Sequence, residues 1–192
     1  EGDLHRVVAL SRGNGQIRWI WEEVDADPGD LVALGDQVYI LDRAGHRVVV
    51  LGPGGTVFRR FGEGTLTAPS RMALGGDGVI YLLDGSKIVR FDPQGNRLAE
   101  VDILPPRLPA TVSVASFAAD RAGILYVGDG AALSTSAEET RQIHRLFPGD
   151  SNFQLLFGYT GPAFHMAFDH HGNLLLVADA GTLVRLKLAV SY

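Results

Sequence analysis

The sequence predicts an all-β protein, namely a β-propeller of four-stranded antiparallel blades, with about four to five blades represented in its 192 residues. The first observation is a set of short apolar runs, each ending in aspartate, that recur about every 40–50 residues. The second is a set of runs rich in arginine and valine, which repeats in phase with the first. Two phased sets at this period are typical of propeller blades.

Four short strands are expected within each repeat. The first strand is expected at Leu31–Leu34, Arg71–Leu74, Ser116–Ala119 and His165–Phe168. Each of these segments has an alanine at the place we align, as expected where strands crowd around a shared axis: Ala33, Ala73, Ala118 and Ala167.

The second strand of each repeat is the run that ends in aspartate, for example Val38–Asp42 and Ile80–Asp84. It is apolar at successive positions, which favours burial on both faces. The third strand is rich in arginine and valine, as in His46–Leu51. The fourth is more polar, as in Thr56–Phe61, which suits an outer edge strand. Turns rich in glycine, proline, asparagine and aspartate join them.

We expect one propeller domain, or part of one, over residues 1–192. It would contain a partial blade at 1–24, blades at about 29–62, 69–102 and 113–158, and a partial blade at 163–190. The first and the last strands expected in the sequence are both third strands of a repeat. The chain is therefore expected to be part of a longer chain or to be completed by a partner, with an autonomous small propeller as the alternative. A β-sandwich would not explain the phased aspartates.

Several motifs resemble the NHL-repeat family, which belongs to the six-bladed propeller superfamily. The resemblance lies in Phe61-Gly62, Ala68-Pro69-Ser70, Met72-Ala73-Leu74, Gly78-Val79-Ile80-Tyr81, Asp84 and Lys87-Ile88-Val89-Arg90-Phe91, and it returns at Phe157-Gly158, Gly161-Pro162 and Met166-Ala167-Phe168. It implies that the blades are a scaffold and that function lies in the loops at one end of the central channel. A complete six-bladed ring would need more strands than this chain supplies.

The composition argues against several classes of function. The net charge of −5 argues against nucleic-acid binding and against attraction to anionic membranes. No apolar run approaches the roughly 20 residues of a membrane helix, so we expect no direct membrane insertion by this segment. The chain has no cysteine, which excludes disulfides and thiol chemistry. Its absence is compatible with the extracytoplasmic (periplasmic or secreted) location that we expect.

The repeated aspartates Asp42, Asp84, Asp129 and Asp179 are interpreted as structural, because a catalytic residue is normally needed once. We expect each carboxylate to accept backbone N–H groups in the turn that follows its strand. His165, His170 and His171 lie near Asp169, and imidazole suits zinc, copper or nickel. However, His170 and His171 fall in a turn and adjacent strand residues face opposite sides, so we predict no metal site and no cofactor.

The start of the innermost strand is the better candidate site. His165 aligns with Leu31, Arg71 and Ser116, and Asp30 lies beside them. We predict that Asp30, Arg71, Ser116 and His165 line the channel mouth and contact a ligand, the alternative being ordinary channel-lining groups solvated by trapped water.

Trp19 and Trp21 lie on one face of an early outer strand. We expect Trp21 to pack between blades. Trp19 is the candidate for contact with a partner protein, because an exposed aromatic side chain can anchor an interface. Two segments depart from the repeat and are expected to be exposed loops, Asp102–Val112 and Ala131–Thr140.

Two functions follow. The first is a non-catalytic propeller that acts as a protein-interaction or structural subunit of a larger assembly. The alternative is a metal-dependent propeller enzyme of the lactonase or lyase type. The resemblance implies that such an enzyme holds a divalent metal at the channel mouth as a Lewis acid. Only Asp30 and His165 stand at suitable places for it, with no equivalent asparagine or glutamate.

Overall fold

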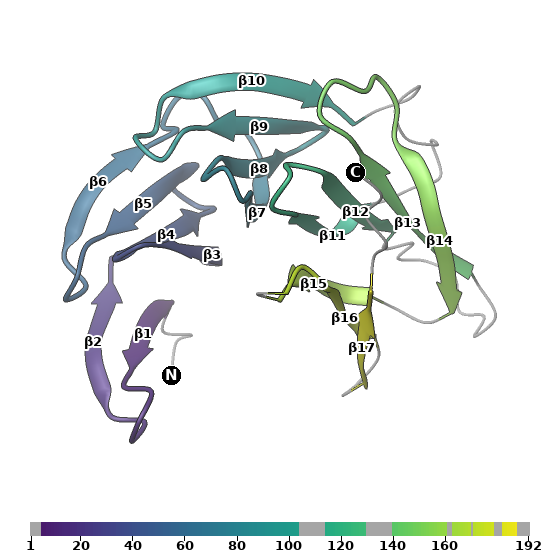
Figure 1. Cartoon of the computed structure of the whole chain (residues 1–192). Coiled ribbons are helices and arrows are strands. Elements are labelled where there is room, and N and C mark those ends of the chain that lie inside the picture. The colour runs from purple at the N-terminus through teal and green to yellow at the C-terminus, as the bar shows by residue number, and fades with distance from the viewer. Residues whose placement is uncertain are drawn as a thin grey trace.

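The computed structural model is an arc of five antiparallel β-sheets that radiate from a common centre like blades (Figure 1). It describes residues 5–103, 114–129, 140–160, 163–169, 171–178 and 182–187. Every regular element in these ranges is a strand. The predicted all-β propeller fold with four-stranded blades is therefore confirmed.

Three sheets have four strands each, and in all three the strands pair in chain order. Their strands are β3 (Pro28–Leu34), β4 (Gln37–Asp42), β5 (Arg47–Leu51) and β6 (Val57–Phe61); β7 (Pro69–Leu74), β8 (Ile80–Asp84), β9 (Lys87–Phe91) and β10 (Arg97–Asp102); and β11 (Val114–Ala119), β12 (Leu125–Asp129), β13 (Thr140–Leu146) and β14 (Gln154–Thr160). The first strand of each sheet, β3, β7 and β11, is the innermost (Figure 1).

The sheets at the two ends of the arc have fewer strands. One pairs β1 (Arg6–Leu10) with β2 (Ile17–Glu22), and the other joins β15 (Ala163–Phe168), β16 (Leu174–Ala178) and β17 (Thr182–Leu186). The register identifies β1 as a third strand, because Leu10 pairs with Ile17 after a bulge just as Leu51 pairs with Val57 in the next sheet. The first sheet thus consists of a third and a fourth strand, and the last sheet of a first, second and third.

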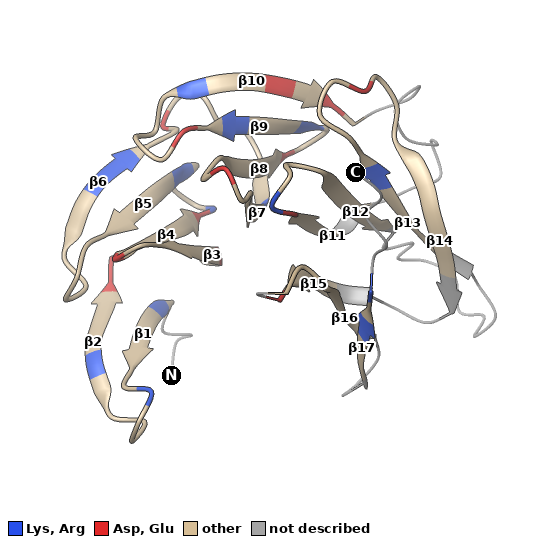
Figure 2. Ribbon diagram, in the orientation of Figure 1, with Lys and Arg blue, Asp and Glu red and all other residues tan. Residues whose placement is uncertain are grey.

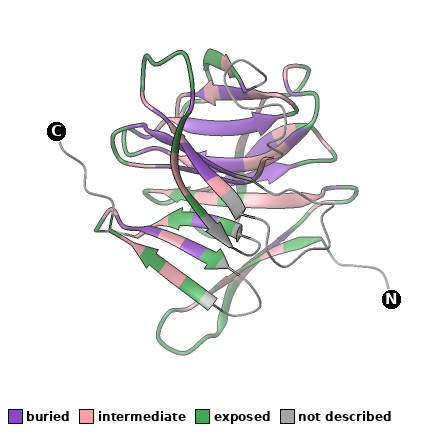
Figure 3. Ribbon diagram, turned by 90° about the vertical axis from the view of Figure 1, so that its right-hand side faces the viewer, coloured by how far each residue is buried: buried purple, intermediate pink, exposed green. Residues whose placement is uncertain are grey.

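Apolar side chains fill the space between neighbouring sheets. The second and third strands are apolar at consecutive positions, and both faces of β4 and β5 are buried, with Ile40 and Val49 fully covered. Figure 3 shows that buried residues are concentrated in the middle sheets. Charged residues lie on the outer strands β6 and β10, as Figure 2 shows. This distribution fits blades that are buried on both faces and exposed to solvent only at their outer edge.

Two of the repeated aspartates, Asp42 and Asp84, accept backbone hydrogen bonds, and the predicted bond from the following turn is confirmed at Asp42. Asp42 accepts hydrogen bonds from the Gly45 N–H in the following turn and from the Asp27 N–H in the segment that leads into β3. Asp84 accepts from the segment before its sheet, through the N–H groups of Thr67 and Ala68. These two carboxylates therefore hold the first two complete sheets to the segments that enter them.

Of the last two aspartates, Asp129 keeps the predicted register and Asp179 does not. Asp129 pairs with Val114 at the position equivalent to Asp84, which pairs with Pro69. In the last sheet that position is Ala178, because Ala178 pairs with Ala163. The sequence therefore misaligns Asp179 with the other three aspartates by one residue. Asp179 itself lies outside the described residues.

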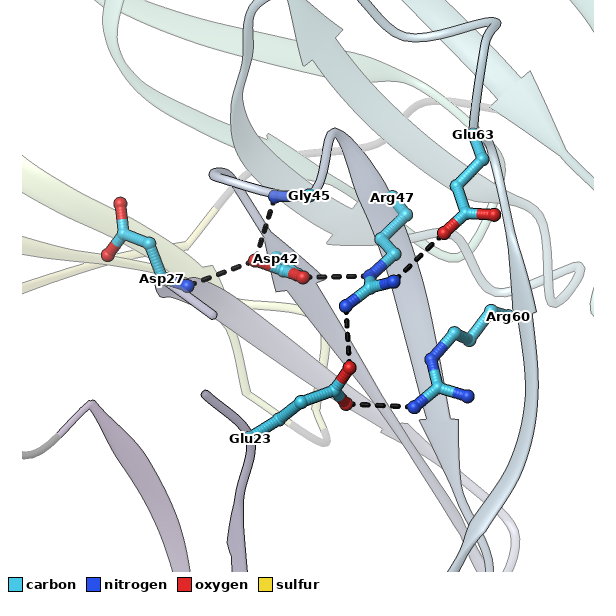
Figure 4. Close-up of polar contacts among 7 residues, drawn as sticks. All are labelled: Glu23, Asp27, Asp42, Gly45, Arg47, Arg60 and Glu63. Atoms are coloured by element: carbon cyan, nitrogen blue, oxygen red, sulfur yellow. Dashed lines mark hydrogen bonds and ion pairs between the residues drawn. The ribbon is translucent and has the colours of Figure 1, made fainter. Parts of the chain in front are cut away.

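An ion-pair network extends the role of Asp42 (Figure 4). The Arg47 guanidinium donates to Asp42 at 2.8 Å, to Glu23 at 2.7 Å and to Glu63 at 2.9 Å. Glu23 also accepts from Arg60 at 2.8 Å. Hydrogen bonds to Glu63 and Asp42 raise the pKa of Arg47. One guanidinium thus joins the segment after β2, the end of β4 and the segment after β6.

The alanines predicted at equivalent places agree in three sheets only. Ala73, Ala118 and Ala167 each pair with the second residue of the apolar second-strand run, but in the first complete sheet that position belongs to Val32. Ala33 is one residue further along and pairs with Val38. In the part of the chain that the structure describes, no helix is long and apolar enough to cross a membrane.

Candidate functional site

The four predicted site residues share one register position in four neighbouring sheets. Asp30, Arg71, Ser116 and His165 pair with Leu41, Leu83, Gly128 and Val177, respectively, on the second strands. In each case the residue directly follows an irregularity in the strand pairing. The sequence aligns Leu31 with this position, but the structure places Asp30 there, because β3 pairs one residue further at its end: Leu34 pairs with Gln37, before the apolar run of β4, whereas Leu74 pairs with Ile80, the first residue of the run in β8.

These positions line a single cavity of about 360 Å³ at the centre of the arc. Its walls are the inner strands β3, β7, β11 and β15. Most of the residues that line it are apolar, among them Met72, Phe117 and Met166. An apolar cavity with a few converging polar groups is the usual form of a small-ligand site.

Asp30 is held in place by backbone donors. One carboxylate oxygen accepts the Met72 N–H at 3.0 Å, and the other accepts the Leu31 N–H at 3.0 Å. The bond to Met72 joins the innermost strands β3 and β7. Asp30 therefore has a clear structural role between two blades, in addition to its place on the cavity wall.

Arg71 and His165 provide the other ionisable groups of the cavity wall. Arg71 is partly exposed, and its guanidinium donates to the carbonyl oxygen of Ser70 at 3.0 Å. His165 is exposed on β15. The wall thus presents an acid, a cation and an imidazole from three different strands.

Ser116 is more deeply buried than the other three predicted site residues. Only 1% of its surface is exposed, and its hydroxyl has no hydrogen-bond partner in the described structure. The Oγ atom lies where a side chain on Gly128 would begin. Its contact with a ligand stays a prediction, and its burial against β12 favours a packing role.

Trp19 is half-buried, whereas the sequence suggested that it is exposed. Its ring packs over Gly55, in the turn between β5 and β6, and joins the same apolar cluster as Trp21. Trp21 is buried between the first two sheets, as predicted. A partner contact through the remaining exposed part of Trp19 stays a prediction.

The histidine-rich turn is built around Asp169. Its carboxylate accepts the backbone N–H groups of His171 and Asn173 and the Asn173 side-chain amide, and it forms an ion pair with Arg185 at 3.2 Å. The Asn173 amide, more than any other group, lowers the pKa of Asp169 to about 2. His170 lies outside the described residues.

The described cavity wall supplies two candidate ligands for the metal of a lyase-type propeller, Asp30 and His165. Each oxygen of Asp30 accepts one backbone N–H group. Among the described residues, no group of three histidine, cysteine, aspartate or glutamate side chains lies close enough to hold a metal ion. The two atypical loops fall almost wholly at residues 104–113 and 130–139, which the structure does not describe.

No protein-family model and no curated protein matches this chain. Solved structures do resemble it. One is a nidogen/laminin complex, at TM-score 0.62 and 16% identity, matching 90% of this chain and 66% of that chain. Another is a protein of unknown function from Bacteroides caccae, at TM-score 0.65 and 15% identity, matching 96% and 66%. A third is a virginiamycin B lyase from Staphylococcus aureus, at TM-score 0.63 and 12% identity, matching 97% and 64%.

These likenesses show the class of fold, a β-propeller, and nothing finer, since the identities are low. The chain spans about two thirds of the length of these solved chains. They include both an interaction complex and an enzyme, and one fold serves many functions.

Sequence reasoning missed the apolar wall of the cavity. The repeat pattern assigns Met72, Phe117 and Met166 only to strands, although each directly follows a predicted site residue in the sequence. That repeated adjacency was the signal that would have found them.

Proposed function

We propose that this chain is an NHL-like, non-catalytic β-propeller that acts outside the cytoplasm as a protein-interaction or structural subunit of a larger assembly. The observation that carries the proposal is the convergence of Asp30, Arg71 and His165 on one cavity of about 360 Å³. The partner inserts an acidic side chain there, and Arg71 and His165 are the residues that receive it.

The chemistry of the wall supports an acidic guest. A guanidinium offers several N–H donors in one plane, which matches the geometry of a carboxylate. Imidazole donates a further hydrogen bond and adds positive charge when protonated. Asp30 is engaged by the backbone of β3 and β7, so it positions the strands around the cavity.

The test uses two short peptides that differ in one group, acetyl-Ala-Glu-Ala-amide and acetyl-Ala-Gln-Ala-amide. Isothermal titration is expected to show binding of the glutamate peptide only. Arg71→Gln should weaken that binding about tenfold or more, because a hydrogen bond to a charged group contributes about 1.5–3 kcal/mol. His165→Gln should weaken it less.

The matched control is Arg97→Gln, which removes an exposed guanidinium from the outer strand β10 and should leave the affinity unchanged. Equal binding of both peptides, or an unchanged affinity in Arg71→Gln, would contradict the proposal. A stoichiometric metal in the purified protein that follows His165 would favour the metal-dependent enzyme instead.

A further inference from the structure

Both ends of the arc present a bare apolar sheet face. The leading face consists of Val8 and Leu10 on β1 and Ile20 on β2, with Leu10 58% exposed. The trailing face consists of Val177 on β16 and Leu183 on β17, with Leu183 63% exposed. Figure 3 shows exposed residues on both end sheets, in contrast to the buried middle sheets.

The counterparts of the leading face are buried. By register, Val8 and Leu10 correspond to Val49 and Leu51 in the next sheet, which have no exposed surface. Those two side chains are covered by β2, whose Trp21 belongs to the same apolar cluster. The leading face therefore has the form of a surface that a preceding blade covers.

The trailing face also has buried counterparts. Val177 occupies the position of Leu41 and Leu83, and Leu183, which pairs with it, occupies the position of Val48 and Ile88. All four counterparts are at most 3% exposed. Leu41 and Val48, for example, share an apolar cluster with residues of β7 and β8 in the following sheet. The trailing face therefore has the form of a surface that a following blade covers.

The edges of β1 and β17 that pair with no described strand support the same conclusion. In the complete sheets a third strand pairs on both sides, but among the described strands β1 pairs only with β2 and β17 only with β16. An open edge beside an apolar face is a template for another strand. The inner edge of β1 and the outer edge of β17 thus each accept a strand, while the two faces accept the flat side of a sheet.

We infer that both faces are covered by further four-stranded blades of the same repeat, carried on the same polypeptide, which close the ring between β17 and β1. The lengths agree with this inference, because the chain spans only about two thirds of the solved propellers that it resembles. The inference does not depend on what the central cavity binds. We expect the blade that covers the leading face to carry buried aromatic side chains, just as β2 covers Val49 and Leu51 with Trp21.

The test measures how fast single cysteines react in the native protein, since residues 1–192 contain none. Leu10→Cys and Leu183→Cys probe the two faces. Leu98→Cys is the control, because Leu98 lies on the outer strand β10 and is 50% exposed. The protein isolated from its source organism is treated with a polar maleimide, and the labelled peptide is identified by mass.

Both face cysteines should react about a hundredfold more slowly than the Leu98 cysteine, since a covered side chain reacts only when the blades separate. Denaturing mass spectrometry should give a chain heavier than 20.6 kDa that contains additional repeats. Because no ligand is added, failure of this test leaves the peptide-binding test untouched, and the reverse also holds.

Three outcomes would overturn the inference. Reaction of the Leu183 cysteine as fast as the control would show a bare face. Protection that disappears on dilution would assign the face to a second copy of the chain. Protection that requires phosphatidylcholine vesicles would assign it to a lipid surface.

Discussion

At the scale of single residues, the carboxylate of Asp42 combines complete burial with a charged partner. It has no exposed surface and accepts hydrogen bonds from two backbone N–H groups and from Arg47. Removing one partner of a buried ion pair leaves the other uncompensated. Asp42→Asn should therefore lower the free energy of unfolding by about 3 kcal/mol, measured by urea denaturation.

The matched control for Asp42 is Glu63→Gln. Glu63 binds the same guanidinium, but its side chain is 60% exposed. An exposed ion pair contributes less than about 1 kcal/mol, so this variant should unfold near the midpoint of the original protein. Equal losses in the two variants would show that burial of Asp42 is unimportant.

Asp169 gives a prediction about pH. Its pKa is lowered from 3.8 to about 2, chiefly by the Asn173 amide and also by Arg185. A depressed folded-state pKa contributes stability that is present above the unfolded value, near pH 4, and is lost as the pH falls toward 2. Asn173→Ala should raise the pKa of Asp169 toward 3.8, measured by NMR titration of its carboxyl carbon.

Asp92, in the turn between β9 and β10, provides the reference for this titration. Asn96 donates its side-chain amide to Asp92, whose pKa is also lowered, chiefly by that contact. Asn173→Ala should leave the pKa of Asp92 unchanged. A shift of both carboxyl groups would indicate general unfolding and not the loss of one hydrogen bond.

At the scale of elements, the turn between β5 and β6 tests how the first sheet is attached to the second. A Cβ on Gly55 would lie 2.8 Å from the ring of Trp19, whereas a Cβ on Gly54 would meet nothing within 4 Å. Both glycines have positive φ, so substitution by alanine strains the backbone at both. Only Gly55→Ala also displaces Trp19.

Gly54→Ala should therefore lower the free energy of unfolding by about 1 kcal/mol, through backbone strain alone. Gly55→Ala should cost a further 1–3 kcal/mol or so, because overpacking forces the neighbouring side chain to move. Thermal unfolding monitored by tryptophan fluorescence measures both effects. Equal melting temperatures would show that the Trp19 ring does not pack on this turn.

The strands were predictable from the sequence because the repeats are in phase and their second and third strands are apolar. The register of β3 was not, since Leu34 pairs with Gln37 ahead of the apolar run, and this places Asp30, and not Leu31, opposite Leu41. The bulge before the site residue is the same in all four sheets, so the difference lies in how far β3 pairs before its turn to β4. The sequence likewise brought Ser116 to the cavity, but only the structure shows its hydroxyl turned toward Gly128.

At the scale of the whole molecule, the inner strands and the end faces depend on the same geometry. Each inner strand is placed by the sheet next to it, as the hydrogen bond from the Met72 N–H to Asp30 shows between β3 and β7. His165 lies on β15, in the sheet that carries the bare trailing face. Closure of the ring should therefore fix the position of His165 relative to Arg71.

This dependence gives a prediction in which one substitution has opposite effects in two settings. In residues 1–192 produced alone, Leu183 is exposed beside Val177, and such a patch promotes association. Leu183→Lys should then reduce self-association, measured by light scattering. In the native protein the same lysine would be buried between two blades without a partner. It should lower the free energy of unfolding there by about 3 kcal/mol or more, as expected for a buried unpaired charge.

Leu98→Lys separates this effect from a general effect of added charge. Leu98 is on the outer strand β10 and should stay exposed in both settings. Its substitution should change the unfolding free energy by less than about 0.5 kcal/mol in either one. A Leu183→Lys variant that behaves like Leu98→Lys in the native protein would mean that no blade covers β17, and the position of His165 would then be set by β11 and its sheet alone.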